Sequence, residues 1–358
     1  MSVKQIEKVM DAAKTAAAVL LSFAATILLI CLVSSTPWQT VKDFFLGPFQ
    51  TTRRIGNVIE MAIPICFTGC GICIMYSTGH INMGSSGYFY IGGLAASMVA
   101  YGLLLPSGLH PVVCILAGGL VAALIAAIPA VLFSAWGINE VVSSLMLNYI
   151  WVYLGTWILR TFMLDSAAGF NASKAFQEET AKLSRIISGT RVHSGLILAV
   201  VVVIFSWLFL KKTKWGYQIR MMGMNSKFSV YSGMGVTGIL LSSQMLGGFL
   251  AGIGGACEVL GMYTRFEWAA APTTGFDGIM VAAIAYRNPA LVPVAALFLA
   301  YVRVGADVIS RTSDVPSEIV SIIQALIIML VGAQMFLSGI RHKQIVKASV
   351  RQLAKEGK

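Results

Sequence analysis

Three cysteines have a spacing that supports redox chemistry in some enzymes. Cys66, Cys70 and Cys73 form a C-x3-C-x2-C pattern, which holds an iron–sulfur cluster in radical enzymes that use adenosylmethionine. Such a cluster needs a water-accessible loop, whereas these cysteines lie in the apolar run IPICFTGCGICIM. Spacings of four and three residues put small side chains on one helix face, so we interpret them as packing residues and predict no metal site.

The sequence also argues against two kinds of nucleotide-binding site. The run from Gly233 to Gly238 fits GxGxxG, but no strand precedes it and an apolar helix is expected to follow. The phosphate-loop pattern GxxxxGK[ST] occurs nowhere in the 358 residues. We therefore predict that this chain has no catalytic residues, binds no cofactor and has no ATPase site of its own.

Charged residues inside apolar runs are the next candidates for function. A charge at mid-bilayer costs roughly 2.5–3.5 kcal/mol on insertion scales, so such groups are expected to be paired, protonated or in contact with water. Arg303 and Asp307 lie four residues apart and can neutralise each other on one helix. Glu258 lies among glycines and is expected to face protein rather than lipid. The full set is Glu60, Glu140, Glu258, Asp277, Arg287, Arg303 and Asp307.

Two polar segments interrupt apolar runs. Residues 79–87, GHINMGSSG, contain three glycines together with Asn82 and Ser85, and residues 137–148, GINEVVSSLMLN, contain Glu140 and Asn148. Polar or irregular backbone is tolerated at membrane depth where it lines a cavity. A cytoplasmic turn and a capped helix start are the alternative interpretations.

Composition gives the setting for these residues. Only 11% of the chain is charged, and AVILMFWYC account for 57%, so most of it cannot face water. At about 20 residues a crossing, the apolar runs predict an all-α membrane protein with about ten transmembrane helices and both termini in the cytoplasm. The predicted spans are 16–33, 55–76, 87–105, 110–134, 138–163, 193–210, 236–262, 275–287, 290–310 and 316–337.

The net charge of +11 is concentrated in three segments, 1–15, 211–230 and 337–358. Cytoplasmic loops carry an excess of Lys and Arg, so these segments are predicted to be inside, and loop 164–192 outside. The transmembrane domain is then 16–337, between an N-terminal segment 1–15 and a basic tail 338–358. Charge confined to one side of a membrane argues against a nucleic-acid partner and leaves anionic membrane lipid as the polyanion to consider.

The basic segment 211–235 has an amphipathic pattern. A short helix from 215 to 228 would place Trp215, Ile219, Met222 and Phe228 broadly on one face. A contact surface for another protein and an ordinary solvated loop both fit this pattern.

Five sequence runs, in order between about residues 55 and 340, resemble bacterial ATP-binding-cassette importer permeases for nucleosides and simple sugars. This family is part of the branched-chain amino acid/ribose-type permease superfamily. The runs are NMGSSGYFYIG from Asn82, NEVVSSLMLNY from Asn139, TKWGYQIRMMGMN from Thr213, AGIGGACE from Ala251 and TGFDGIMVAA from Thr274, the last followed by RNP from Arg287. The chain departs from the pattern at Tyr88, where the family has Gln, and at Ala285-Tyr286, where Leu-Gly is usual.

The resemblance implies a transport subunit with several partners. These are a separate cytoplasmic ATPase that holds ATP-Mg, an extracytoplasmic substrate-binding protein or lipoprotein, and a second, homologous permease. The long N-terminal region and outside loop resemble the larger permease of nucleoside systems, which implies a heterodimer. The complex would import a nucleoside-like or sugar-like solute across the bacterial cytoplasmic membrane.

The resemblance also implies roles for individual residues. The ATPase-coupling residues would be Thr213, Gly216, Arg220, Gly223, Asn225 and Phe228. The substrate pathway would include Asn82, Ser85, Glu140, Asn148, Glu258, Phe276 and Asp277, and we expect Asn82, Asn148 and Glu258 to approach one another or their counterparts in a partner chain. The alternative is a secondary transporter driven by an ion gradient, with Glu140, Glu258 or Asp277 as the proton or sodium site. The identity of the solute stays open.

Overall fold

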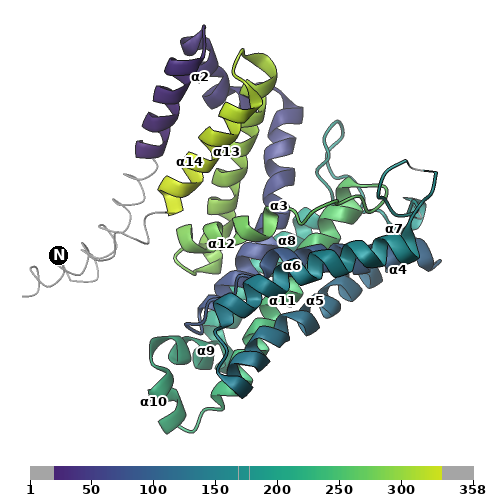
Figure 1. Ribbon diagram of the computed structural model, residues 1–358, viewed down its shortest axis with the longest axis vertical. Coiled ribbons are helices and arrows are strands. Elements are labelled where there is room, and N and C mark those ends of the chain that lie inside the picture. Colours follow the sequence, from purple (N-terminus) through teal and green to yellow (C-terminus); the bar gives the residue numbers. More distant parts are fainter. Residues whose placement is uncertain (1–19, 168, 177, 333–358) are drawn as a thin grey trace, which may run out of the picture. The chain divides into compact units, whose positions relative to one another are not determined.

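The computed structural model describes residues 20–167, 169–176 and 178–332 (Figure 1). Among these residues the only extended pairings are two isolated bridges, so the prediction of an all-α chain is confirmed. The described residues form two compact units, one made of 20–51 with 301–332 and the other lying within 52–300. The predicted N-terminal segment 1–15 and the basic tail 338–358 lie outside the described residues.

The first unit packs N-terminal helices against the end of the chain. Its elements are Leu20–Val33, α2 (Pro37–Leu46), the end of α13 (Val292–Thr312) and α14 (Ser317–Gly332). Tyr301 donates a hydrogen bond of 2.9 Å to the Phe45 carbonyl. The Asp314 carboxylate accepts hydrogen bonds from Ser34 and Ser35, which hold the pKa of Asp314 well below its usual range.

The second unit contains the segments that the sequence singled out. Its long helices are α3 (Thr52–Tyr76), α4 (Ser85–Gly102), α5 (Leu109–Trp136), α6 (Glu140–Ile158), α8 (Gly195–Lys212) and α11 (Val236–Met262). A five-residue π-helix, Leu159–Met163, extends α6. The shorter helices are α7 (Glu178–Ala181), α9 (Lys214–Met224), α10 (Ser226–Tyr231) and α12 (Thr274–Ile284).

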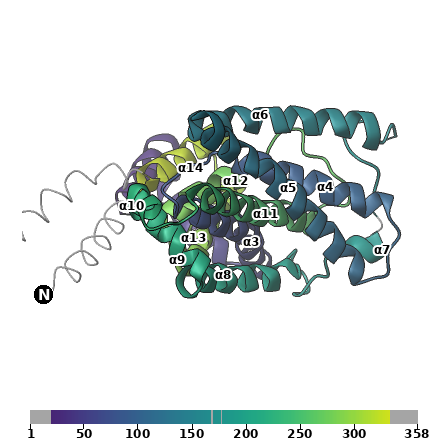
Figure 2. The same ribbon diagram turned by 90° about the horizontal axis from the view of Figure 1, so that it is seen from below.

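Helix α11 lies at the centre of this unit and packs against α3, α4 and α5 (Figure 2). Glycines permit backbone contact along these interfaces. A Cβ atom at Gly92 would overlap the Gly252 backbone, and one at Gly71 would lie 2.5 Å from the Gly247 carbonyl oxygen. Small residues at these positions allow the close approach that stabilises helices where no water is present.

The turns of the second unit gather at two opposite ends. Gly223, in α9, contacts the turn after α3, and His80 in that turn contacts Phe133 near the end of α5. At the other end, His110 at the start of α5 contacts Thr180 of α7. The structure thus separates the 211–235 segment from loop 164–192, as the predicted topology requires, while the side that faces the cytoplasm stays a prediction.

Six described helices are long and apolar enough to cross a membrane: Thr52–Tyr76, Leu109–Trp136, Glu140–Met163, Gly195–Lys212, Val236–Met262 and Pro289–Thr312. Helix α12 has 11 residues and is therefore only about 16 Å long. The predicted span 275–287 is thus not a full crossing, because residues 263–273 before it are not helical. The total of about ten spans stays a prediction.

Candidate functional site

The turn after α3 changes the direction of the chain inside the second unit. The Ser77 and Thr78 hydroxyls donate hydrogen bonds of 2.6 Å to the Cys73 and Met75 carbonyls, which also accept bonds of 3.2 Å from the backbone N–H groups of the same two residues. Gly79 follows with φ of 83°, a left-handed conformation that glycine adopts without strain. The chain then runs without helical structure to α4.

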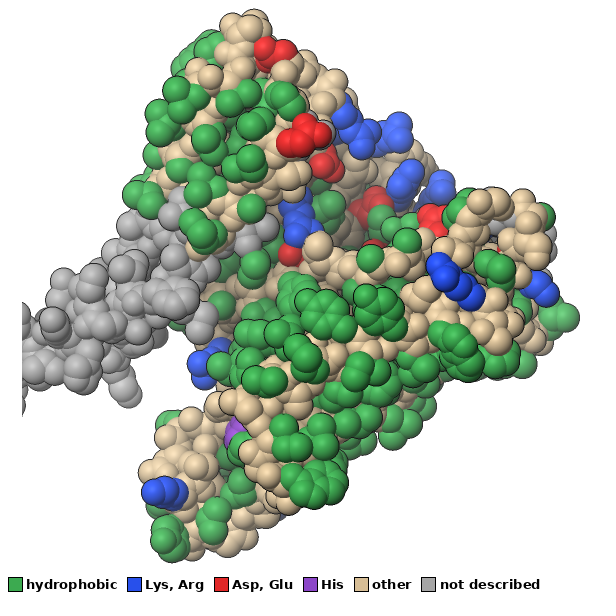
Figure 3. Space-filling view, viewed as in Figure 1, with side chains coloured by type: hydrophobic (Ala, Val, Ile, Leu, Met, Phe, Trp, Pro, Cys, Tyr) green, Lys and Arg blue, Asp and Glu red, His purple; other side chains and the backbone are tan. Residues whose placement is uncertain are grey.

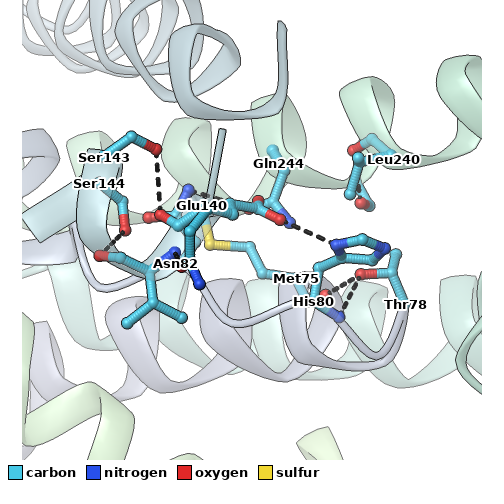
Figure 4. A network of polar contacts seen from close by, with 12 residues as sticks. Met75, Thr78, His80, Asn82, Glu140, Ser143, Ser144, Leu240 and Gln244 are labelled. Carbon is cyan, nitrogen blue, oxygen red and sulfur yellow. Dashed lines mark hydrogen bonds and ion pairs between the residues drawn. The ribbon is translucent and has the colours of Figure 1, made fainter. Parts of the chain in front are cut away.

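Asn82 is the central residue of this turn (Figure 4). Its side chain is fully buried, and its Nδ2 group donates a hydrogen bond of 3.1 Å to Oε1 of Gln244 on α11. Its Oδ1 atom accepts hydrogen bonds from the Gly84 backbone N–H at 2.8 Å and from the Tyr88 hydroxyl at 3.1 Å. Tyr88, the departure from the family pattern, therefore takes part in the same network.

Helix α6 also holds the start of α4. The Asn148 side-chain oxygen accepts a hydrogen bond from the Gly87 backbone N–H, and the Ser144 hydroxyl accepts one of 2.9 Å from the Met83 N–H. The first N–H groups of a helix have no partner within the helix. Asn82 and Asn148 therefore share one structural task, which is to satisfy the backbone where α4 begins.

These polar groups lie at a common depth. Thr68, Asn148 and Gln244 are each eight residues from the helix end on the 211–235 side, which is about 12 Å at the rise of an α-helix. We call Thr68, Asn82, Ser86, Asn148 and Gln244 the polar layer. The chain thus places a band of amides and hydroxyls well inside the apolar part of three long helices.

The beginning of α12 reaches the polar layer from the opposite end. Ser86 donates a hydrogen bond of 3.1 Å to the Pro272 carbonyl, and Thr68 donates one of 3.2 Å to the Thr274 carbonyl. A Cβ atom at Gly275 would overlap the Ser86 backbone, so the starts of α4 and α12 are in direct contact. No open passage separates these two helix starts.

Three more predicted pathway residues lie near this contact. Asp277 is in the first turn of α12 and is 2% exposed, whereas Phe276 beside it is half-buried. Ser85, the first residue of α4, is buried, and its hydroxyl has no hydrogen-bond partner among the described residues. Among the predicted pathway residues Ser85 alone has a hydroxyl group, and no described residue uses it in a hydrogen bond.

Glu140 lies closer to the 211–235 end. Its carboxylate is 3.0 Å from Nδ1 of His80 (Figure 4). The His80 ring packs edge-on against Phe133. Asn139 caps α6 by accepting hydrogen bonds from the backbone N–H groups of Val141 and Val142. The sequence interpretation of 137–148 as a capped helix start is confirmed, and Glu140 gains an acid–imidazole contact that the sequence alone did not indicate.

Glu258 lies away from the polar layer. Asn82 contacts α11 at Gln244, and Glu258 is 14 residues further along that helix, about 21 Å away. Glu258 is buried, as predicted, but within this chain it does not approach Asn82 or Asn148. Its electrostatic neighbour Tyr263 follows the end of α11, so Glu258 belongs to the outer end of the unit.

His193 is a buried residue at the same outer end of the unit. Its ring is fully buried against Gly195 and Gly261, and its Nδ1 atom accepts a hydrogen bond of 3.2 Å from the Gly195 N–H. Burial lowers the pKa of His193 from 6.5 to about 4, because the charged form would lose its hydration. The ring is therefore neutral at physiological pH.

The predicted coupling segment forms two short helices instead of one. Asn225 separates α9 from α10 and caps α10 by accepting a hydrogen bond of 3.0 Å from the Phe228 N–H. Thr213 caps α9 in the same way, by accepting one of 3.0 Å from the Gly216 N–H. Both residues thus have local structural roles that their spacing in the sequence could have indicated.

Two further coupling residues contact their own chain. Arg220 donates a hydrogen bond to the Leu210 carbonyl near the end of α8. A Cβ atom at Gly223 would overlap the Ser77 carbonyl oxygen, and the Gly223 Cα atom lies 3.3 Å from the position of a Cβ atom at Gly79. Through Gly223, α9 is therefore in direct contact with the turn that carries Asn82.

The predicted amphipathic face is wrong in part. Ile219 and Met222 are buried, together with Gly216, but Trp215 and Phe228 are about half exposed. Trp215 lies four residues before Ile219 and so on the same face, but it is in the first turn of α9, where the helix end leaves its side chain half exposed. Phe228 belongs to α10, which Asn225 separates from α9. The exposed large side chains of this segment, most of which the motif did not identify, are Trp215, Tyr217, Met224, Phe228, Val230 and Tyr231.

Comparison with known proteins gives a consistent result. The family described as "Branched-chain amino acid transport system / permease component" matches residues 54–332. The glucose ABC transporter permease protein TsgB13 of Haloferax volcanii is 29% identical over 84% of this chain and 82% of its own length. The guanosine ABC transporter permease protein NupP of Bacillus subtilis is 28% identical over 88% of this chain and 91% of its own length.

A third relative, the nucleoside ABC transporter permease protein NupB of Lactococcus lactis, is 25% identical over 93% of this chain and 94% of its own length. No solved structure matches the chain. The family match covers most of both the sequence and the second structural unit. Together with six long apolar helices, these findings identify a multi-pass protein of the cell membrane. The chain belongs to the branched-chain amino acid transport system permease component family.

Proposed function

We propose that this chain is a permease subunit of an ATP-binding-cassette importer for a nucleoside-like or sugar-like solute. The relatives named for nucleosides and glucose support this cargo class. Neutral amides and hydroxyls in the polar layer suit a cargo rich in hydroxyl groups and ring nitrogens. ATP hydrolysis and solute capture belong to separate proteins in this proposal.

The contact between Gly223 and the Ser77–Gly79 turn is the observation that carries the proposal. Helix α9 carries the exposed aromatic side chains Trp215 and Tyr217 and contacts this turn at Gly223. An ATPase that moved α9 would therefore displace the segment that carries Asn82. In this proposal Gly223 and Arg220 contact the chain itself, and the exposed side chains of α9 and α10, Phe228 among them, form the docking surface.

Cargo passage requires the start of α4 to move. In the arrangement described, the Asn82 and Asn148 oxygens bond to backbone N–H groups of residues 84 and 87. The Ser86–Gly275 contact leaves no passage between α4 and α12. Displacement of the turn after α3 would free these groups, which links the movement of α9 to the pathway.

Reconstitution tests this function. The chain is co-expressed with the neighbouring ATPase and permease genes and the substrate-binding protein, and uptake of labelled guanosine and glucose into proteoliposomes is measured. Uptake that requires ATP and stops when the catalytic glutamate of the ATPase is replaced is the expected result. Uptake that persists without ATP and collapses with an ionophore would instead identify a secondary transporter.

A matched pair of variants tests the docking surface. Tyr217→Ala removes an exposed side chain from α9, whereas Leu120→Ala removes one of similar exposure from α5, remote from that surface. The Tyr217 variant is expected to lower ATPase recovery with the permease, and the Leu120 variant to leave it unchanged. Equal ATPase recovery with both variants would refute docking on α9.

A further inference from the structure

Helix α6 has one face that the other helices of the second unit do not cover. Its inner face, with Ser144, Asn148 and Gly155, packs against α4. The opposite face carries large exposed side chains at helical spacing: Val142, Met146, Tyr149, Tyr153 and Trp157. Figure 3 shows hydrophobic side chains gathered on this side of the molecule. Of the six long apolar helices, α6 is the least buried.

The chemistry of this face differs from that of a lipid-facing helix. Tyr149 is 55% exposed and Tyr153 is 75% exposed, and neither hydroxyl has a hydrogen-bond partner among the described residues. Tyrosine is enriched where a membrane meets water, because there its ring is in an apolar setting and its hydroxyl is hydrated. A phenol in hydrocarbon has no such partner.

The position of these tyrosines excludes an interfacial location. The apolar segment Glu140–Met163 has its midpoint between residues 151 and 152. Tyr149 and Tyr153 lie within about 4 Å of that midpoint along the helix axis. The hydrocarbon core is about 30 Å thick, so a crossing helix places both hydroxyls near its centre.

Two other long helices provide the comparison. At matching depth, the exposed residues are Leu120, Val121 and Leu124 on α5 and Val201, Ile204 and Phe205 on α8, and none of them carries a hydroxyl group. Neither α5 nor α8 contains a tyrosine. These helices have the composition expected against lipid, whereas α6 has hydroxyl groups that need a polar neighbour.

We infer that the Tyr149–Tyr153–Trp157 face of α6 is the surface on which a second permease chain packs. The inference rests on the proposed function, in which two permeases form one transporter. A facing helix of protein can supply backbone carbonyls or polar side chains to the two hydroxyls, and lipid tails cannot. Aromatic side chains also provide the large, rigid contact area that is common in the centre of protein interfaces.

Photo-cross-linking of the complete transporter tests this inference. Benzoylphenylalanine replaces Tyr149 or Tyr153, and, as depth-matched controls, Leu120 or Val201. Mass spectrometry then identifies the adducts formed in the native membrane. We expect the α6 positions to form adducts with a second permease polypeptide, either another copy of this chain or a homologue. The controls are expected to form no adducts with protein. Lipid adducts alone at the α6 positions, or adducts with the ATPase or the binding protein, would overturn the inference.

A conservative variant tests the role of the hydroxyls. Tyr149→Phe with Tyr153→Phe keeps the rings and is expected to lower the recovered two-permease complex by at least about fivefold on native gels. Unchanged recovery would contradict the hydrogen-bond argument. Uptake by the unmodified transporter is measured in parallel. ATP-dependent uptake with only lipid adducts refutes the interface alone, whereas permease adducts without ATP-dependent uptake refute the proposed function alone.

Discussion

Helix α9 and the outer loop 164–194 are both polar connections between long helices, yet they are attached to the unit in different ways. Helix α9 is held by close fit at Gly223 and by a side-chain hydrogen bond from Arg220. The outer loop is held mainly by its backbone. Ser173 and Phe176 donate hydrogen bonds to the Phe266 and Thr264 carbonyls, at 2.8 and 2.9 Å.

This difference indicates which connection can transmit movement. Any residue except proline can donate a backbone hydrogen bond, so most exposed side chains of the outer loop are replaceable. The contact at Gly223 has no room for a Cβ atom, so it requires glycine. It also leaves no gap between the two segments, so a displacement of one must move the other. The α9 contact is therefore suited to transmission, and the outer loop to closing the opposite end of the unit.

The largest expected effect comes from Gly223→Ala. The new methyl group would overlap the Ser77 carbonyl, so α9 must shift away from the turn after α3. We expect ATP-dependent uptake to fall by at least about tenfold, which corresponds to roughly 1.4 kcal/mol in the transport barrier. Uptake and ATPase activity are measured together in proteoliposomes. ATPase activity is expected to persist.

Gly235→Ala is the matched control for this variant. Gly235 lies in the same segment, and a Cβ atom there would meet nothing within 4 Å. Uptake is expected to stay at the level of the unmodified protein. If both glycine variants transport normally, the Gly223 contact has no part in coupling, and the contrast between the two connections is lost.

The outer loop also has buried side chains that cannot be replaced freely, and His193 is one of them. Its pKa is lowered to about 4 in the folded protein, so the unfolded chain binds a proton first as pH falls below 6.5. Stability is fully present above pH 6.5 and is lost between pH 6.5 and 4, by about 3 kcal/mol for this group. Thermal unfolding in detergent as a function of pH measures the loss.

His193→Gln is the control for the pH effect. Glutamine does not titrate, so the variant is expected to be less stable at pH 7 but to lose less stability between pH 6.5 and 4. An identical pH dependence in the two proteins would mean that other groups cause the acid sensitivity of the outer end.

Asn148→Leu tests whether an amide of the polar layer supports the fold or the pathway. Loss of the amide leaves the buried Gly87 N–H without a partner, which costs about 1–3 kcal/mol. We therefore expect folded protein and transport to fall together. The sequence favoured a pathway role, in which transport would fall more than protein level. Quantitative immunoblotting beside uptake separates these outcomes, and a selective loss of transport would restore the pathway interpretation.

The smallest effect is expected from Asp165→Asn in the outer loop. The Asp165 carboxylate is 3.2 Å from Arg265, and both side chains are more than a quarter exposed. Partly exposed ion pairs contribute about 0–1 kcal/mol, so the melting temperature and uptake should change little. A large loss of either property would show that the loop depends on specific side chains after all.

Much of the fold could be predicted from the sequence. Long apolar runs determine the positions of α3, α5, α8 and α11 to within a few residues, because a membrane requires continuous helical hydrogen bonding. The burial of Glu258 followed from its neighbouring glycines. These predictions depend on local composition, which the sequence displays directly.

The roles of the polar residues were harder to predict. Asn82 and Asn148 carry amides that suit either a cargo or an unpaired backbone group, and the choice depends on where α4 begins in space. The role of Gly223 was equally hard to predict, because it depends on contact with the Ser77 carbonyl, nearly 150 residues away in the sequence. Sequence spacing describes one helix at a time, whereas these contacts join different helices.

The glycine contacts of α11 affect how the second unit responds to force. At Gly247 and Gly252, its backbone lies directly against the backbones of α3, α4 and α5, with no side chain between them. Side chains at an interface can change rotamer and so act as a soft layer, and here that layer is missing. A push on the end of α3 is therefore delivered to the four helices together, which behave as one stiff block.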